Sequence, residues 1–444
     1  MYEANTIELA GKPTVSLINQ GFANDARSSA SNKGMPGIRF IPESVPCETT
    51  VMEFIEAGVT AVIDDVIAAL TRPLTAEETS PKPRGGGLRE RIIFNGTLGE
   101  INRFFYRRGW TDGLPVIPPT EEAVAEMLTG TDLPATHLVG KLIPRLGKVT
   151  VEKIAINAVM AGALPTYMPV LIAGVQALID TESGFGVFGV SAGSWAPFWV
   201  INGPIRKDLR VNSGFGALSP GDIANAAIGR SMGLIIKNLG GIRKAVEDMG
   251  SLGNPCKYSF VTAENEEDSP WEPLHVEYGF NREDSTVSVS FPNNFRQGSG
   301  GDGDSRGIIR GLLAGITGPG AFTLEPGQAQ ILARDGWKKK EVKEFLCEYA
   351  RIPASRSPAY TGRQTGAAPA QRNKHLSPLN PEETVPILNN PDFIKLIVAG
   401  GTHGAIGIFT GGHRAPVIKK VMLPANWDRL VKKYQDVVPA YELY

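Results

Sequence analysis

The sequence predicts an α/β fold in which a small parallel α/β unit precedes a larger mixed α/β domain. Segments rich in β-branched and aromatic residues alternate with segments of helical periodicity along the 444 residues. In addition, residues 12–75 follow the order strand, helix, strand, helix, which is typical of a parallel sheet. A chain of this length is expected to hold more than one domain and can bury a large core.

Four elements are expected in the N-terminal stretch. Strands are predicted at "TVSLI" (14–18) and "IRFIP" (38–42), and the helix between them is predicted over 22–34, ending at Gly34. A long amphipathic helix is predicted over 49–71, with apolar residues three or four positions apart. Two strands bury little apolar area, so we expect this unit to lean on the rest of the protein.

Residues 76–91 lack periodicity and are rich in Pro, Gly and charged residues, which is typical of a linker. We therefore predict three regions. They are a small α/β domain at 1–75, a linker at 76–95 and a main α/β catalytic or binding domain at 96–444.

Helix signals open the main domain. Thr97 and Glu100 have the spacing of a capping box, and Thr120 is placed to cap the next helix. Residues 150–180 predict two packed helices, with the break at Pro165. Further along the chain we expect strands at 195–201, 257–263, 285–291 and 393–401, and a helix at 304–316.

Charge and composition exclude several classes of protein. Lys and Arg total 45 against 46 for Asp and Glu, without long blocks of one sign, which argues against nucleic acid and membrane surfaces as partners. The three cysteines are far apart and form no CxxC pair, as expected in a reducing cytoplasm. Residues 1–13 do not resemble a secretion signal, and the longest apolar run, 168–179, is too short to cross a bilayer. We expect a soluble cytoplasmic protein, and its glycine loops and apolar strands suit a homo-oligomer.

The stretch "VNSGFGALSPGDIANAAIGR" (211–230) places a glycine-rich loop directly before a predicted helix. Ser219 is predicted as the helix N-cap, with Pro220 at the first helical position and Asp222 as the capping-box acid. Free amides at a helix N-terminus, assisted by guanidinium groups, favour an anion. The residues expected to bind it are Arg206, Arg210, Asn212, Ser213, Gly214 and Ser219.

The same stretch has a second interpretation. Small residues such as Ala224, Gly229 and Gly233 would let the helix pack closely on a neighbour while the loop merely turns. The sequence contains neither GxxxxGK[ST] nor GxGxxG followed by a ribose-binding acid, so nothing in it assigns a nucleotide or another cofactor.

Two other segments offer binding or catalytic groups. "GWTDGLP" presents Trp110 and Asp112 in a rigid loop, where they could bind a substrate or simply form a capped turn. Lys153 lies on a helix face that is otherwise apolar. It would be a base or Schiff-base lysine if buried, and a solvated lysine if its ammonium group reaches water.

The candidates for proton transfer are Glu264, His275 and His403. Glu264 follows an apolar strand, His275 lies in an acidic segment together with Glu272, and His403 lies in a glycine turn after a strand. Acidic runs are usually solvated faces, and a histidine in a turn often only bonds its own backbone. Cys47 precedes a predicted helix, where a thiolate is stabilised, and is a candidate for thiol chemistry.

"GFANDARSSASNKGMPGIRFIPESVP", followed by the long helix ending "DDVIAALT", resembles the C-terminal half of the UGSC family, whose motif is selenocysteine or Cys, then Gly, Ser and Cys. The larger protein often paired with that family is similar to "GWTDGLPVIPPTEEAV", "VEKIAINAVMAGALP", "INGPIRKDLRVNSGFGALSPGDIANAAIGR", "AENEEDSPWEPLHVEYGF" and "LIVAGG". The resemblance implies thiol or selenol redox chemistry. The Cys-Gly-Ser-Cys motif is absent from this sequence, so a second chain would have to supply it.

We therefore expect an enzyme that acts on a small anionic organic substrate by redox or lyase chemistry, with a thiol involved. Two alternatives remain open. One is a non-catalytic subunit that completes the active site of a partner with the Cys-Gly-Ser-Cys element. The other is a metal-dependent hydrolase, with Glu272 and His275 as ligands.

Overall fold

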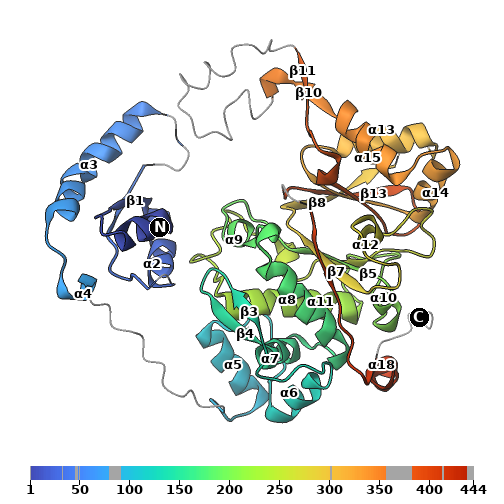
Figure 1. Ribbon diagram of the computed structural model, residues 1–444, viewed down its shortest axis with the longest axis horizontal. Coiled ribbons are helices and arrows are strands. Elements are labelled where there is room, and N and C mark those ends of the chain that lie inside the picture. The colour runs from blue at the N-terminus through green and yellow to red at the C-terminus, as the bar shows by residue number, and fades with distance from the viewer. Residues whose placement is uncertain are drawn as a thin grey trace.

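The computed structural model describes residues 2–32, 34–45, 49, 51–79, 92–300, 303–356, 383–412 and 415–437. Helices and several small sheets make up these residues, which confirms the predicted α/β fold (Figure 1). Among the described residues, no helix has both the length and the apolar character that crossing a membrane requires.

The N-terminal unit has the predicted order of strand, helix, strand and helix. Its strands are parallel, with Ser16 opposite Phe40, and its buried core is small. The elements are α1 (Tyr2–Leu9), β1 (Ser16–Asn19), α2 (Ala23–Asn32), β2 (Phe40–Glu43), α3 (Met52–Thr71) and α4 (Ala76–Thr79).

Helix α3 leaves most of its apolar side uncovered. Gly58 is its one buried residue, and α3 lies at the outer edge of the N-terminal unit (Figure 1). Its exposed apolar side chains are Met52, Phe54, Val59, Ile63, Ile67 and Leu70. The predicted amphipathic stripe is therefore present, but little of it is used inside the described chain.

The larger body begins with helices and continues with mixed elements. The capping box of Thr97 with Glu100 and the Thr120 cap both form as predicted. The helices are α5 (Leu98–Arg108), α6 (Glu121–Leu128), α7 (Val151–Ala161), α8 (Met168–Ile179), α9 (Phe185–Phe188), α10 (Ile205–Asp208), α11 (Ile223–Ile235), α12 (Leu274–Glu277), α13 (Ser305–Gly315), α14 (Pro326–Arg334), α15 (Lys339–Tyr349) and α18 (Trp427–Tyr434).

Two four-stranded mixed sheets form the centre of this body. One has the order β14-β7-β5-β6 and the other the order β12-β9-β13-β8, each with parallel and antiparallel pairs. Their strands are β5 (Phe198–Asn202), β6 (Val261–Ala263), β7 (Thr286–Ser290), β8 (Asn294–Ser299), β9 (Gly320–Leu324), β12 (Ile394–Val398), β13 (Ala405–Thr410) and β14 (Val417–Lys420). The other described strands of this body form two antiparallel pairs, the hairpin of β3 (Leu138–Leu142) with β4 (Gly147–Thr150) and the pair of β10 (Arg351–Pro353) with β11 (Thr384–Pro386).

The two sheets are the inner layers of a four-layer sandwich, because successive side chains of a strand face opposite sides of its sheet. On β5, Trp199 and Ile201 face the core beneath α7, α8 and α11, whereas Phe198 and Val200 face the second sheet. Phe409 of β13 reaches the same inter-sheet core, where its ring centroid lies 4.5 Å from that of Phe198. The outer face of the second sheet packs on α13, α14 and α15.

A buried polar contact ties the N-terminal unit to the larger body. Ser28 of α2 donates its hydroxyl to Glu247, and Arg145 donates to Ser28 Oγ at 3.1 Å. Ser28 and Glu247 are both buried. The N-terminal unit therefore contacts the larger body through this buried group of side chains.

Candidate functional site

The helix after the glycine-rich loop begins later than predicted. Helix α11 starts at Ile223, and its N-cap is Asp222, not Ser219. Gly221 adopts a φ of +143°, which is incompatible with a helix, so Pro220 and the exposed Ser219 belong to the preceding turn. The Ser219 cap is therefore wrong. At its other end the helix continues into a π-helical turn (Ile236–Gly240), which ends at Gly241 in the left-handed conformation.

Polar groups of the 211–222 loop are used within the protein. Asn212 donates its side-chain amide to Asp222 at 2.8 Å and accepts from the Gly214 amide at 2.8 Å. The Ser213 carbonyl accepts from the Gly400 amide at 2.8 Å. On the helix itself, a Cβ on Gly229 would lie 2.1 Å from Ser259 Oγ. The close-packing interpretation of this stretch is therefore favoured over an anion cradle.

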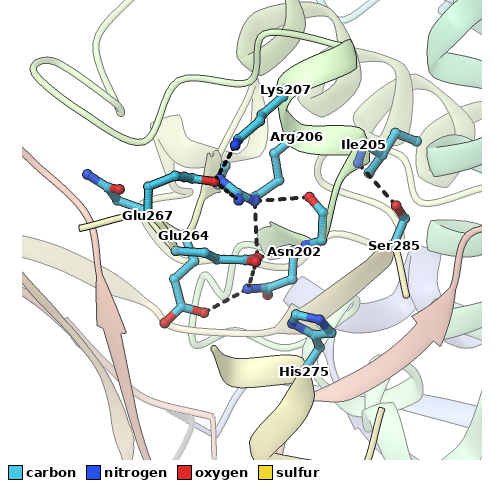
Figure 2. Close-up of polar contacts among 12 residues, drawn as sticks. Asn202, Ile205, Arg206, Lys207, Glu264, Glu267, His275 and Ser285 are labelled. Carbon is cyan, nitrogen blue, oxygen red and sulfur yellow. Dashed lines mark hydrogen bonds and ion pairs between the residues drawn. The ribbon is translucent and has the colours of Figure 1, made fainter. Parts of the chain in front are cut away.

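Arg206 is buried in an ion pair, which corrects its predicted role. Its guanidinium donates to both oxygens of Glu267 at 3.1 and 2.7 Å and to the Gly203 carbonyl at 3.0 Å (Figure 2). This bond lowers the pKa of Glu267 to about 2. The charge of Arg206 is thus already neutralised inside the protein. Arg210 is exposed, with a φ of +52°.

Glu264 follows β6 as expected but is completely buried. Its side chain accepts from Asn202 Nδ2 and from the Leu274 amide, both at 2.7 Å (Figure 2). The other oxygen lies 3.8 Å from Lys339 Nζ and accepts from the Val398 amide at 3.5 Å. Since these partners come from separate elements, Glu264 joins elements of both sheets, and its burial is a correction to the predicted role in proton transfer.

His275, the second residue of α12, is also fully buried. Its Nε2 lies 3.4 Å from the Arg282 carbonyl oxygen. Glu272, in contrast, is exposed. The two residues therefore lie in different environments, which does not support them as the two metal ligands of a hydrolase. Near them, burial would raise the pKa of Glu277, but Lys339 and Lys343 outweigh it and hold that pKa below its usual range.

His403 and Cys47 have different outcomes. His403 is exposed, and its ring packs edge-on against Phe215 of the 211–222 loop, with centroids 5.6 Å apart. The structure thus brings this histidine to the loop predicted to hold the anion, although the strand before it, β12, belongs to a mixed sheet. Cys47 lies outside the described residues. Burial raises the pKa of Cys256 and of Cys347, which suits packing residues.

A basic pocket unites two predicted residues, Trp110 and Lys153, with cations that the sequence did not single out. The cavity has a volume of about 420 Å³ and no acidic side chain among its lining residues. The residues that line it are Arg108, Gly109, Trp110, Arg145, Gly147, Lys148, Lys153, Lys237, Asn238, Leu239, Gly241 and Arg243.

Local structure places each of these cations. Arg108 ends α5 and stacks over the ring of Trp110, with 5.7 Å between its Cζ and the ring centroid. Lys153 lies in the first turn of α7, is exposed, and donates to the Lys148 carbonyl at 2.9 Å. Of the two alternatives for Lys153, the structure therefore favours the solvated lysine over the buried base or Schiff-base lysine. Lys237 lies on the π-helical turn, a feature that recurs at functional sites.

Lys237 is a cation of the basic pocket whose pKa is lowered by its surroundings. Its ammonium group donates to the Gly109 carbonyl. Burial lowers the pKa of Lys237, Asp112 opposes this shift, and Arg243 adds to it. A lysine held in this way gives up its proton more readily than an exposed one.

Glu247 partly compensates two of the arginines. Arg145 Nε and Arg243 Nη2 both donate to Glu247 Oε1 at 2.9 Å. Burial would raise the pKa of Glu247, but its bonds with Arg243, Ser28 and Arg145 prevail and lower it to about 2. The basic pocket thus keeps an excess of positive charge beside the junction with the N-terminal unit.

Asp112 is close to the basic pocket but does not line it. Both of its oxygens accept from Arg230, at 2.8 and 3.0 Å. This ion pair satisfies the carboxylate and fixes the "GWTDGLP" loop against α11. The capped-turn interpretation therefore fits Asp112, whereas Trp110 belongs to the pocket.

The fold and the pocket define an α/β protein with a cationic cavity. Comparison with known families gives a match to the UGSC family over residues 1–72. This supports UGSC-family membership for the N-terminal part of the chain, which runs from α1 through α3. No curated protein and no solved structure matches the chain.

Metal ligands do not gather in the part of the chain that the structure describes. Within it, no group of three or more His, Cys, Asp or Glu side chains is placed to hold a metal ion. The alternative of a metal-dependent hydrolase therefore gains no ligand set from these residues.

Proposed function

We propose that this protein is an enzyme that binds a small organic anion in the basic pocket. One observation carries the proposal: six cationic side chains and Trp110 line a single cavity without an acidic neighbour among the lining residues. Carboxylates and phosphates are the groups that such a set of guanidinium and ammonium donors recognises. The volume of about 420 Å³ suits a small molecule.

Of redox and lyase chemistry, the pocket supports lyase chemistry more directly. Lyase reactions need a proton moved next to a bound anion, and Lys237 offers an ammonium whose pKa is lowered by burial. Among the described residues no cysteine lines the pocket, so thiol-linked redox chemistry would require a group from outside this lining. The cations would bind and orient the substrate, and Trp110 would provide a flat apolar wall.

Replacing Lys148 or Lys153 by Met should weaken the binding of succinate or inorganic phosphate about tenfold, because each change removes one charge-assisted hydrogen-bond donor. Both side chains are exposed, so the fold should tolerate the change. Dissociation constants from ligand-observed NMR would measure the effect. Lys340→Met, on the exposed side of α15, is the matched control. Unchanged affinity in both pocket variants would contradict the proposal.

A second candidate function is that of a subunit completing a partner that carries the Cys-Gly-Ser-Cys element. The observation that favours it is the uncovered apolar stripe of α3 in the UGSC-matching part. The helix also carries four acids and no basic residue, so a partner with apolar and basic groups would complement it.

Ile63→Lys should abolish co-elution of this chain with a UGSC-family protein that contains the motif, since a charge would enter an apolar contact. Ile63 is exposed, so the helix content measured by circular dichroism should stay the same. Asp65→Lys, which lies on the opposite side of α3, introduces the same group and should leave co-elution intact. Absence of a complex with the unmodified chain would rule this function out.

A further inference from the structure

A second and larger cavity lies beside the basic pocket. We call it the aromatic pocket, and its volume is about 860 Å³. Aromatic and aliphatic side chains dominate its walls, among them Phe185, Trp195, Tyr258, Phe291, Ile236 and Ile242. Flat apolar walls of this kind bind planar or aliphatic groups of organic molecules.

Most charges in the aromatic pocket are already paired with each other. Asp112 is bound by Arg230, and Asp248 accepts from Lys257 at 2.7 Å through both oxygens. Two exposed or half-buried lysines, Lys237 and Lys244, have no carboxylate within ion-pair distance among the described residues. The cavity therefore has an apolar interior and fewer unpaired cations than its neighbour.

The segment 236–245 forms a wall shared by the two cavities. Asn238, Leu239, Gly241 and Arg243 line the basic pocket, whereas Ile236, Ile242, Lys244 and Ala245 line the aromatic pocket. Lys237 lines both. The π-helical turn at 236–240 accounts for this placement, because its wider spacing changes the direction in which successive side chains leave the helix.

We infer that the two pockets take one amphipathic organic anion, with its carboxylate or phosphate in the basic pocket and its aromatic or aliphatic body in the aromatic pocket. The inference rests on the proposed function and specifies its substrate class. Lys237 meets the ligand where its charged group joins its apolar body. The apolar walls of the aromatic pocket attract the apolar body. The six cations of the basic pocket, of which only Arg145 and Arg243 are paired with Glu247, attract the anion.

A matched set of ligands tests the inference. Dissociation constants for acetate, 2-naphthylacetate and the neutral 2-naphthaleneethanol would be measured by ligand-observed NMR on the full chain. We expect 2-naphthylacetate to bind at least tenfold more tightly than either of the other two, because only it uses both cavities. Tyr258→Ala should remove most of that gain and leave acetate binding unchanged, whereas Tyr349→Ala, at a similarly exposed tyrosine on α15, should change neither.

The outcomes separate this inference from the proposed function. If acetate binds but the naphthyl group adds nothing, or if Tyr258→Ala weakens both anions equally, the shared ligand is refuted and the anion pocket stands. If the neutral alcohol binds as tightly as 2-naphthylacetate, the coupling of charge and apolar body is likewise refuted. If none of the anions binds, the proposed function itself fails.

Discussion

Glu264→Ala is expected to lower the free energy of unfolding by about 3–5 kcal/mol, the scale for removing one partner of a buried ion pair. The side chain is 0% exposed and accepts from Asn202, the Leu274 amide and the Val398 amide. Without it, the Leu274 and Val398 amides lose this acceptor in a region that excludes water. The Lys339 ammonium group keeps Glu277 at 3.2 Å but loses the second carboxylate, 3.8 Å away. Urea unfolding followed by circular dichroism would measure the change.

Glu272→Ala is the matched control for this prediction. It removes the same charge from the same acidic segment, but its side chain is exposed, so a change within about 0.5 kcal/mol is expected. If the Glu264→Ala variant unfolded at the same urea concentration as the wild type, the structural role would be contradicted. Glu264 would then again be a candidate for proton transfer.

Elements that depend on local chemistry could be predicted from the sequence. The Thr97–Glu100 capping box and the Thr120 cap form where expected, and the strands β5, β6, β7 and β12 form within or next to the predicted segments. The Ser219 cap fails for a non-local reason. Asn212 donates to Asp222 across the loop, and Gly221 accommodates the turn that results. The helix therefore starts at Ile223 and not at Pro220.

The candidate site could be predicted only in part. Trp110 and Lys153 were identified from their own segments, but the pocket also depends on Arg145, Lys237 and Arg243, which belong to no recognisable motif in the sequence. Close backbone approach brings them together, since a Cβ on Gly147 would lie 2.0 Å from the Leu239 carbonyl oxygen. A glycine in a hairpin signals that an element packs there, but it does not say which one.

Burial likewise gives a structural role to charged residues for which the sequence predicted a role in binding or catalysis. Arg206 and Glu264 have the residue types and positions of binding or catalytic groups. Each, however, forms its hydrogen bonds with other residues of the protein. The sequence alone does not distinguish an arginine that binds a substrate from an arginine that forms an internal ion pair, as Arg206 does with Glu267. The distinction needs the fold, because Glu267 lies 61 residues away in the sequence.

Glu247→Gln is expected to lower the free energy of unfolding at pH 7 by about 3 kcal/mol, the value of a pKa held at about 2 instead of the usual 4.5. A carboxylate with a lowered pKa in the folded state stabilises the protein above its unfolded pKa and loses that contribution as the pH falls. The difference between wild type and variant should therefore be full above pH 4.5 and vanish as the pH approaches 2. Glu283→Gln, an exposed neutralisation, should show no such window.

The same variant should raise the affinity of the basic pocket for phosphate severalfold while it lowers stability. Glu247 competes with any bound anion for Arg145 and Arg243, and a neutral glutamine competes less. Because Glu247 also accepts from Ser28, the variant should loosen the N-terminal unit, which hydrogen exchange at α2 would report. Tighter phosphate binding together with faster exchange would link the UGSC-matching segment to the pocket through one carboxylate. Weaker phosphate binding would contradict that competition and show that Glu247 instead holds the arginines in their binding positions.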